Sequence, residues 1–188
     1  NFAKANADRL LAEAYHAEVG SWTTSPYLDN DGNVIRDLDK KWWVYAELDQ
    51  TAGALSLENP SYVDKYLRFT NNWWLDNMVD ETHHGVWNLL SWPELENILP
   101  KQYPWKNGFH TYEHALVGYI TSEVHLTGKV KLYFARQQGE ESEVVRPYYH
   151  AGEIESLNVE PMPPLVGDDN LPSIPGLNRV AVVFTQVE

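Results

Sequence analysis

The spacing of apolar residues along the first 128 positions predicts four helices. Apolar side chains recur there every three or four positions, as on one face of an amphipathic helix. Gly20, the Asn59-Pro60 pair and Gly128 interrupt the pattern and are typical helix stop signals. The predicted helices cover residues 3–18, 41–58, 61–80 and 109–127.

Between and after these helices the pattern changes to short extended runs. Residues 20–39 predict a hairpin, because the turn signal Asn30-Asp31-Gly32 lies between two such runs, and residues 84–92 form a further extended stretch. Beyond Gly128, β-branched and aromatic residues indicate strands. These strands are expected at residues 129–137, 143–151, 153–161 and 179–187, with a loop at 162–176. We therefore divide the chain into residues 1–128 and a small β-rich extension, 129–188, of unknown role.

A repeat within the first 128 residues predicts how the helices are arranged. Gly20-Ser21-Trp22 and Gly85-Val86-Trp87 lie 65 positions apart. Each follows a predicted helix, and each precedes a loop and then a helix that begins with Trp. Helix pairs that recur at a fixed interval are typical of helical arrays, in which each pair buries its apolar stripe against its neighbours. We therefore expect a mostly α fold: an arc of a toroid of helix pairs with hairpin-like insertions.

Composition narrows the classes of partner. The formal net charge is −13, from 14 basic and 27 acidic residues, so phosphate backbones and anionic membranes would repel the chain. There is no cysteine, and no apolar run reaches the roughly 20 residues of a membrane span. All eight tryptophans precede residue 106. Because Trp and Tyr stack on sugar rings, a neutral sugar suits this composition. The chain begins at Asn1 with neither an initiator Met nor a signal-peptide pattern, so we expect a cytoplasmic protein that continues upstream of Asn1.

Two segments combine aromatic and titratable residues at predicted helix starts. One runs from Lys41 through Trp42 and Trp43 to Glu47, and the other is residues 105–110, Trp-Lys-Asn-Gly-Phe-His. In a toroid of helix pairs, equivalent helix ends point to the same opening. The tryptophans, the carboxylate and the histidine are therefore expected to line one pocket.

These segments resemble motifs of the N-acylglucosamine 2-epimerases, cellobiose 2-epimerases and mannose isomerases. KWWVYAE resembles the family's Lys-x-Trp-Trp-x-x-Ala-Glu segment, and PWKNGFH resembles its Trp-Lys-x-x-x-His segment. Residues 61–87 resemble the helix between them. The resemblance covers residues 1–128. It implies an (α/α)6 barrel that removes and returns the proton at C2 of an open-chain sugar, with neither a redox cofactor nor a metal.

The resemblance also implies roles for individual residues. It makes His110 an acid/base residue, because histidine as a residue type gains and loses a proton near neutral pH. It places Trp42, Trp43, Glu47, Trp105, Glu113 and His114 against the substrate. Many relatives have an arginine where this chain has Glu113, so an anion replaces a cation there.

The family's second catalytic histidine lies in a His-x-x-Glu motif that has no counterpart in this sequence. The chain is therefore expected to supply one half of the site. The partners implied are a mono- or disaccharide substrate, the remaining half of the barrel and a second copy in a homodimer, without nucleic acid or membrane.

Three other functions fit parts of the same sequence. His110, Glu113 and His114 form His-x-x-Glu-His, the inverted zinc-peptidase signature, whose third ligand could be Glu153 or Glu155. A glycoside hydrolase on the same toroid would use carboxylates as acid and base. The carboxylates considered are Glu47, Asp80 and Glu113. A non-catalytic sugar-binding module is the third alternative.

Overall fold

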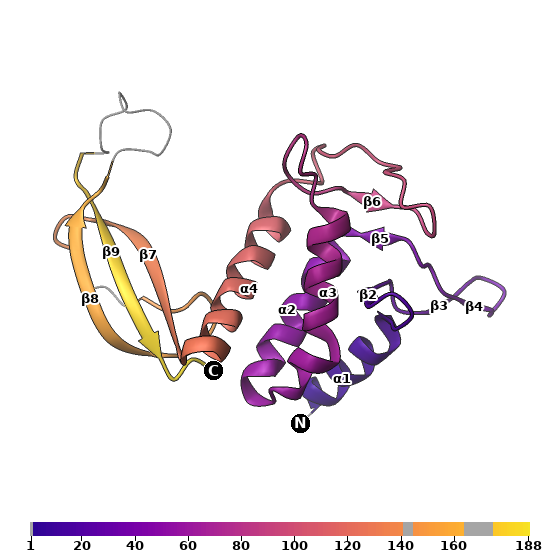
Figure 1. The fold of residues 1–188 in the computed structure, drawn as a ribbon, viewed down its shortest axis with the longest axis horizontal. Coiled ribbons are helices and arrows are strands. Elements are labelled where there is room, and N and C mark those ends of the chain that lie inside the picture. Colours follow the sequence, from indigo (N-terminus) through magenta and orange to yellow (C-terminus); the bar gives the residue numbers. More distant parts are fainter. Residues whose placement is uncertain (1, 141–144, 164–174) are drawn as a thin grey trace. The chain divides into compact units, whose positions relative to one another are not determined.

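The structure is a computed structural model that describes residues 2–140, 145–163 and 175–188 (Figure 1). By its internal contacts the chain divides into two compact units, Asn1–Thr121 and Ser122–Glu188. The sequence placed the division at residues 128 and 129, whereas by contacts the last turns of the fourth helix group with the second unit.

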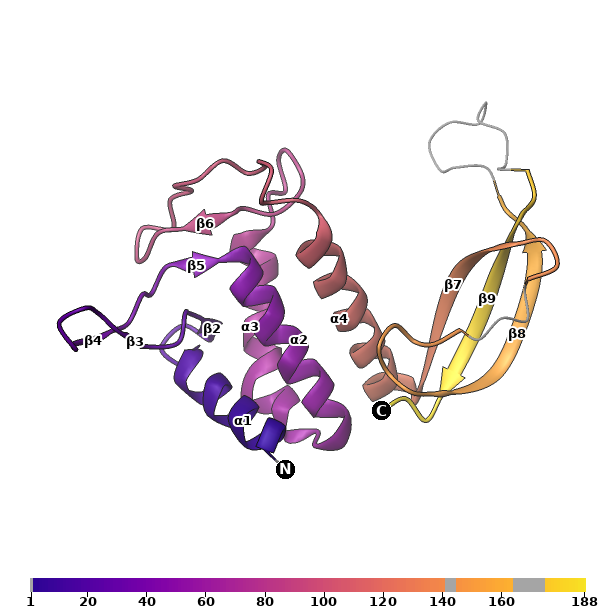
Figure 2. The same cartoon turned by 180° about the vertical axis from the view of Figure 1, so that it is seen from behind.

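The helices follow the predicted pattern closely, and the last of them begins in the first unit and ends in the second. They are α1 (Phe2–Ala14), α2 (Trp42–Glu58), α3 (Arg68–Trp73) and α4 (Phe109–Thr127), with π-helical turns η1 (Val63–Leu67) and η2 (Trp74–Met78) on either side of α3. The predicted helix over 61–80 is thus one continuous helical segment with two wider turns. In both views α1, α2 and α3 lie side by side (Figure 1 and Figure 2). Among the described residues, no helix is both long and apolar enough to cross a membrane.

The first predicted helix ends earlier than its apolar pattern suggested. The residues after Ala14 turn into a strand, because Tyr15 and His16 pair with Trp22 and Ser21. The amide of Thr23 donates to the Ala14 carbonyl at 2.9 Å and closes this small hairpin. Tertiary pairing therefore overrides the helical periodicity of residues 15–18.

Three two-stranded antiparallel sheets lie in the connections of the first unit. They pair β1 (Tyr15–His16) with β2 (Ser21–Trp22), β3 (Tyr27–Leu28) with β4 (Val34–Ile35), and β5 (Lys40–Lys41) with β6 (Leu89–Leu90). The β3–β4 hairpin confirms the turn predicted at Asn30-Asp31-Gly32, where Gly32 has a φ of 82°. The β5–β6 pair matters for the site, because it holds the start of α2 against the segment that follows α3.

An aromatic core holds α1, α2 and the η1–α3–η2 helix together. Trp22, Tyr45 and Tyr66 are fully buried at its centre, and Tyr45 stacks on Trp73 with ring centroids 5.5 Å apart. Edge-on contact between Tyr15 and Trp22, at 5.4 Å, closes the hairpin end. Much of the aromatic content that suggested sugar binding therefore serves to pack the helices.

The second unit contains a three-stranded antiparallel sheet. Its strands are β7 (Lys129–Gln137), β8 (Glu153–Pro161) and β9 (Leu177–Thr185), in the order β7-β9-β8. All three predicted strands at these places are confirmed. Residues 145–151 form turns and no strand, so that part of the predicted 143–151 strand is wrong. Residues 143–144 and most of the predicted loop at 162–176 lie outside the described residues.

The predicted fold class, an arc of an (α/α)6 toroid, is wrong. The described chain is a mixed α/β fold in which four helices are combined with four small sheets. The 65-residue repeat does not produce equivalent units: Trp22 is buried in the helical core, while Trp87 is partly exposed beneath Lys101. Trp105, expected to lead a helix, lies in the loop before α4 and is 85% exposed.

Candidate functional site

Helices α2 and α4 run parallel, and their facing side chains form two histidine–carboxylate pairs. Glu47 contacts His110, and two residues further along α2, Asp49 contacts His114. His110 and His114 are one helical turn apart and so lie on the same face of α4. The two pairs differ in exposure, and that difference decides what each can do.

The loop before α4 fixes the position of His110. The Phe109 amide donates to Asn107 Oδ1 at 2.9 Å, which caps the start of the helix. Gly108 packs so closely on Tyr112 that an added Cβ would lie 2.4 Å from the ring. His110 is therefore held in the first turn of a capped helix.

The outer pair is His110 with Glu47. His110 Nδ1 donates to Glu47 Oε1 at 2.7 Å, and the two side chains are 30% and 48% exposed. A carboxylate can only accept, so the proton of a neutral imidazole must sit on Nδ1. The lone pair is then on Nε2, which is the arrangement needed for a general base oriented by a carboxylate.

Two indoles lie beside this pair. The Trp42 ring meets the His110 imidazole edge-on, with centroids 5.0 Å apart and planes inclined by 71°. The Trp43 ring lies 6.4 Å from the imidazole and is about half exposed. Trp42 is buried and packs against the imidazole from the core side, whereas Trp43 has an exposed ring surface next to the imidazole.

A second carboxylate completes the outer cluster. One ligating atom from each of Glu47, His110 and Glu113 lies within 4.8 Å of the others, and among the described residues this is the group that could share a metal ion. The inverted zinc-peptidase motif requires His110 and His114 as joint ligands. Here Glu47 takes the place of the second histidine, because His114 is engaged with Asp49.

The inner pair, His114 with Asp49, is part of the core. Its side chains are 11% and 3% exposed, and His114 Nε2 donates to Asp49 Oδ2 at 2.8 Å. The other oxygen of Asp49 accepts from Trp22 Nε1 at 2.7 Å and from Thr70 Oγ1 at 2.5 Å. Trp74 covers the imidazole, with centroids 4.4 Å apart. This histidine joins helices and has little room to meet a substrate.

Two other residues singled out in the sequence lie away from the outer cluster. The Trp105 ring makes no aromatic or cation–π contact with the described part of the chain. Asp80 accepts an ion-pair hydrogen bond from Lys101 and also the amides of Thr82 and His83, both at 3.0 Å. The Lys101 hydrogen bond lowers the pKa of Asp80 to about 2, so Asp80 stays ionised and is unsuited to act as a general acid.

Sequence reasoning missed Lys106, which lies in the motif that contains His110. Its ammonium lies 4.7 Å from the centroid of the Trp42 ring, and the residue is only 5% exposed. Burial, and secondarily the charge of Lys101, lowers the pKa of Lys106. The available signal was its position between two residues already assigned to the site, Trp105 and His110.

Comparison with protein-family models, with curated proteins and with solved structures finds no match for this chain.

Proposed function

We propose that this protein is a sugar 2-epimerase or aldose–ketose isomerase in which His110 transfers the proton at C2 of an open-chain sugar. The observation that carries the proposal is the His110–Glu47 pair, which leaves Nε2 of a partly exposed imidazole free to take a proton. The motif resemblance of residues 1–128 supports the substrate class, although the barrel it implied is not formed.

The pair has the properties that this reaction needs. Abstraction of the C2 proton leaves an enediolate, and the same imidazole can then return the proton as an acid. Glu47 stabilises the imidazolium that exists between the two steps, because its carboxylate accepts from Nδ1 in both protonation states. Trp43 offers its exposed face to the apolar side of a sugar chain.

A single imidazole favours isomerisation over epimerisation. One base on one face of the enediolate can carry the proton from C2 to C1, while a hydroxyl proton passes from O2 to O1 through water, and so interconvert an aldose and a ketose. Epimerisation at C2 also needs an acid on the opposite face of the substrate. His114 does not suit that role, since it donates to Asp49 in the core, and we propose that another segment or a partner chain provides it.

The test is hydrogen exchange at C2. The protein is incubated with candidate aldoses in heavy water, and deuterium incorporation at C2 is followed by NMR. We expect incorporation by the wild type and a drop of roughly 10³-fold for H110N, because acid–base catalysis by one side chain contributes about 10²- to 10⁴-fold. E47Q should lose less, since it leaves the base in place and alters only its orientation and charge balance.

The matched control is H84N. His84 is exposed and has a φ of 60°, a conformation that asparagine adopts readily, so its replacement leaves the fold intact. H84N should exchange like the wild type. Equal rates for H110N and the wild type would rule out His110 as the base.

A metal site is the second candidate, favoured by the Glu47, His110 and Glu113 cluster. A single histidine with two carboxylates suits a divalent ion, which would polarise the sugar oxygens instead of leaving proton transfer to the imidazole. The same exchange assay separates the two: a metal mechanism is lost on treatment with a chelator and in E113Q, and is restored to the wild type by zinc or manganese. The proposed proton transfer withstands the chelator.

A further inference from the structure

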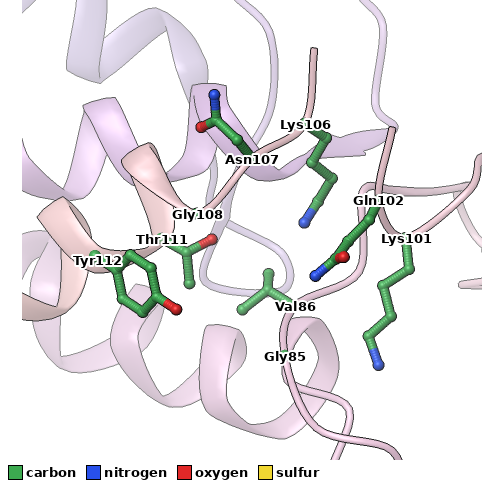
Figure 3. Close-up of a pocket in the computed structure, with 9 residues that line it drawn as sticks. All are labelled: Gly85, Val86, Lys101, Gln102, Lys106, Asn107, Gly108, Thr111 and Tyr112. Carbon is green, nitrogen blue, oxygen red and sulfur yellow. The ribbon is translucent and has the colours of Figure 1, made fainter. Parts of the chain in front are cut away.

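A cavity with a mixed apolar and polar lining lies beside the start of α4. It has a volume of about 120 Å³, and besides Val86 and two glycines it is lined by Lys101, Gln102, Lys106, Asn107, Thr111 and Tyr112 (Figure 3). In Figure 3 the side-chain nitrogens of Lys106 and Gln102 point into the same space, and the Thr111 hydroxyl lies on the α4 side of it. About 30 Å³ is one water's share of the liquid, so the cavity has room for a tetrahedral oxyanion.

Lys106 is the main reason to expect an anion there. The residue is 5% exposed, and within the described chain no carboxylate or other hydrogen-bond acceptor meets its ammonium, which rests on the Trp42 ring. The ammonium faces the cavity, and a largely buried residue whose charge has no counterion there is costly to the fold. Burial accordingly lowers the pKa of Lys106, and an anion entering the cavity would relieve that cost.

The start of α4 adds hydrogen-bond donors. Asn107 caps the Phe109 amide, and the first amide of the 19-residue helix to find a backbone carbonyl is that of Tyr112, which donates to Gly108 at 2.9 Å. The amides of His110 and Thr111 in the first turn therefore lack carbonyl partners within the helix. Helix N-termini with such free amides attract anions.

The charge around the cavity contrasts with that of the whole chain. The formal net charge is −13, yet the described residues that line the cavity include two lysines and no carboxylate. Asp80 neutralises Lys101 through their ion pair. That leaves Lys106 as the uncompensated cation, which matches one anionic group.

We propose that this cavity binds the phosphate oxyanion, as inorganic phosphate or as the phosphate group of a phosphorylated sugar, held by Lys106, Thr111 and the first amides of α4. The sugar phosphate, as one of the two sources, rests on the proposed function. Lys106 and His110 contact the same Trp42 ring, so a phosphate on Lys106 would keep the attached sugar chain near the imidazole.

The proposal is tested by titrating the protein with inorganic phosphate and following backbone amide signals by NMR. The Gly108 to Thr111 signals should shift in the wild type. K106M should bind about tenfold more weakly or worse, since a charge-assisted hydrogen bond contributes about 1.5–3 kcal/mol and 1.4 kcal/mol is tenfold.

K65M is the matched control. The Lys65 ammonium also lies 4.7 Å from an aromatic centroid, that of Tyr66, but is exposed and outside the cavity. K65M should bind phosphate like the wild type. No shift in the wild type, or equal affinity in K106M and the wild type, overturns the proposal. If K106M does not fold, T111V replaces it, with about three- to tenfold weaker binding expected and unchanged binding as the contrary result.

Glucose and glucose 6-phosphate distinguish the two sources of the phosphate group. If a phosphorylated sugar is the ligand, glucose 6-phosphate binds more tightly than inorganic phosphate and competes with it. If free phosphate is the ligand, glucose 6-phosphate and inorganic phosphate bind with equal affinity, and added glucose changes the affinity of neither. Chemical shifts report binding without turnover, so a protein that binds phosphate but exchanges no C2 proton keeps this inference and loses only the proposed function.

Discussion

At the scale of single residues, Lys40 is a buried cation held by aromatic rings. It is fully buried, its ammonium donates to His16 Nδ1 at 3.1 Å, and it lies 5.0 Å from the Trp92 centroid and 5.7 Å from that of Trp73. Burial lowers its pKa from 10.5 to about 8. The folded chain therefore releases this proton at a lower pH than the unfolded chain does.

The shift predicts a stability that rises with pH. Between pH 8 and 10.5 the unfolded chain binds more protons at Lys40 than the folded chain, so raising the pH favours folding. K40M removes the buried charge and should be more stable than the wild type at pH 7, by up to about 3 kcal/mol. Urea unfolding should show that the difference in free energy of unfolding between K40M and the wild type is smaller at pH 10 than at pH 7. K41M, which removes a partly exposed neighbour paired with Asp37, should not be more stable than the wild type at pH 7.

The site residues that the sequence predicted were chosen from residue types at fixed spacing in short motifs. Trp42, Glu47 and His110 were named from motifs, and the structure brings them together. Trp105 has the same local signal but ends in an exposed loop, because nothing in its neighbours indicates which side of the chain it faces. His114 was assigned to the substrate, and only its partner Asp49, 65 residues away, reveals that it belongs to the core.

At the scale of elements, Asp49 joins three separate parts of the first unit. Its carboxylate accepts hydrogen bonds from Trp22 in β2, Thr70 in α3 and His114 in α4. Each donor is buried or nearly so, which makes an unmet donor costly. The mutual placement of these elements therefore depends on one acidic side chain.

D49N should be strongly destabilising. The amide keeps the shape of the side chain but replaces one acceptor oxygen with a donor, which leaves a buried N–H or O–H group unpaired. We expect a loss of about 3 kcal/mol in the free energy of unfolding, measured by urea titration. D76N, at an exposed position of η2, should cost less than about 0.5 kcal/mol. Similar losses in the two variants would show that Asp49 does not join the elements.

Elements were more predictable than their arrangement. The helix at 41–58 and the strand at 129–137 follow directly from local periodicity and β-branched content. The toroid failed because periodicity shows that a helix has an apolar face and does not show which element covers it. Trp22 and Trp87 both follow a glycine two positions earlier, after a helical segment, yet Trp22 is buried in the aromatic core and Trp87 lies under Lys101.

At the scale of the whole molecule, each unit has its own apolar interior. The aromatic core lies within residues 11–90, whereas the sheet of the second unit buries aliphatic and aromatic side chains from β7 and β9. Phe184 is fully buried there and packs edge-on against Phe134, with centroids 6.3 Å apart. Its partners across the sheet are Val130 and Ile154.

F184A should therefore act within the sheet. Removal of a buried phenylalanine side chain costs about 3–5 kcal/mol. Amide hydrogen exchange should show faster exchange throughout β7, β8 and β9 and unchanged exchange in α2. Ile154 is the cross-strand partner of Phe184 but is 49% exposed, so I154A should change the exchange rates of the sheet amides little. Faster exchange in α2 of F184A would mean that the two interiors do not unfold separately.

The parallel alignment of α2 and α4 has a consequence for how the protein folds. The Glu47–His110 and Asp49–His114 pairs close loops of 63 and 65 residues, whereas the contacts of Asp49 with Trp22 and Thr70 span 27 and 21. Contacts between distant positions cost more chain entropy and form later than local ones. We therefore expect the helical core to assemble before α4 docks, so that the imidazole that we assign to proton transfer reaches its carboxylate late in folding.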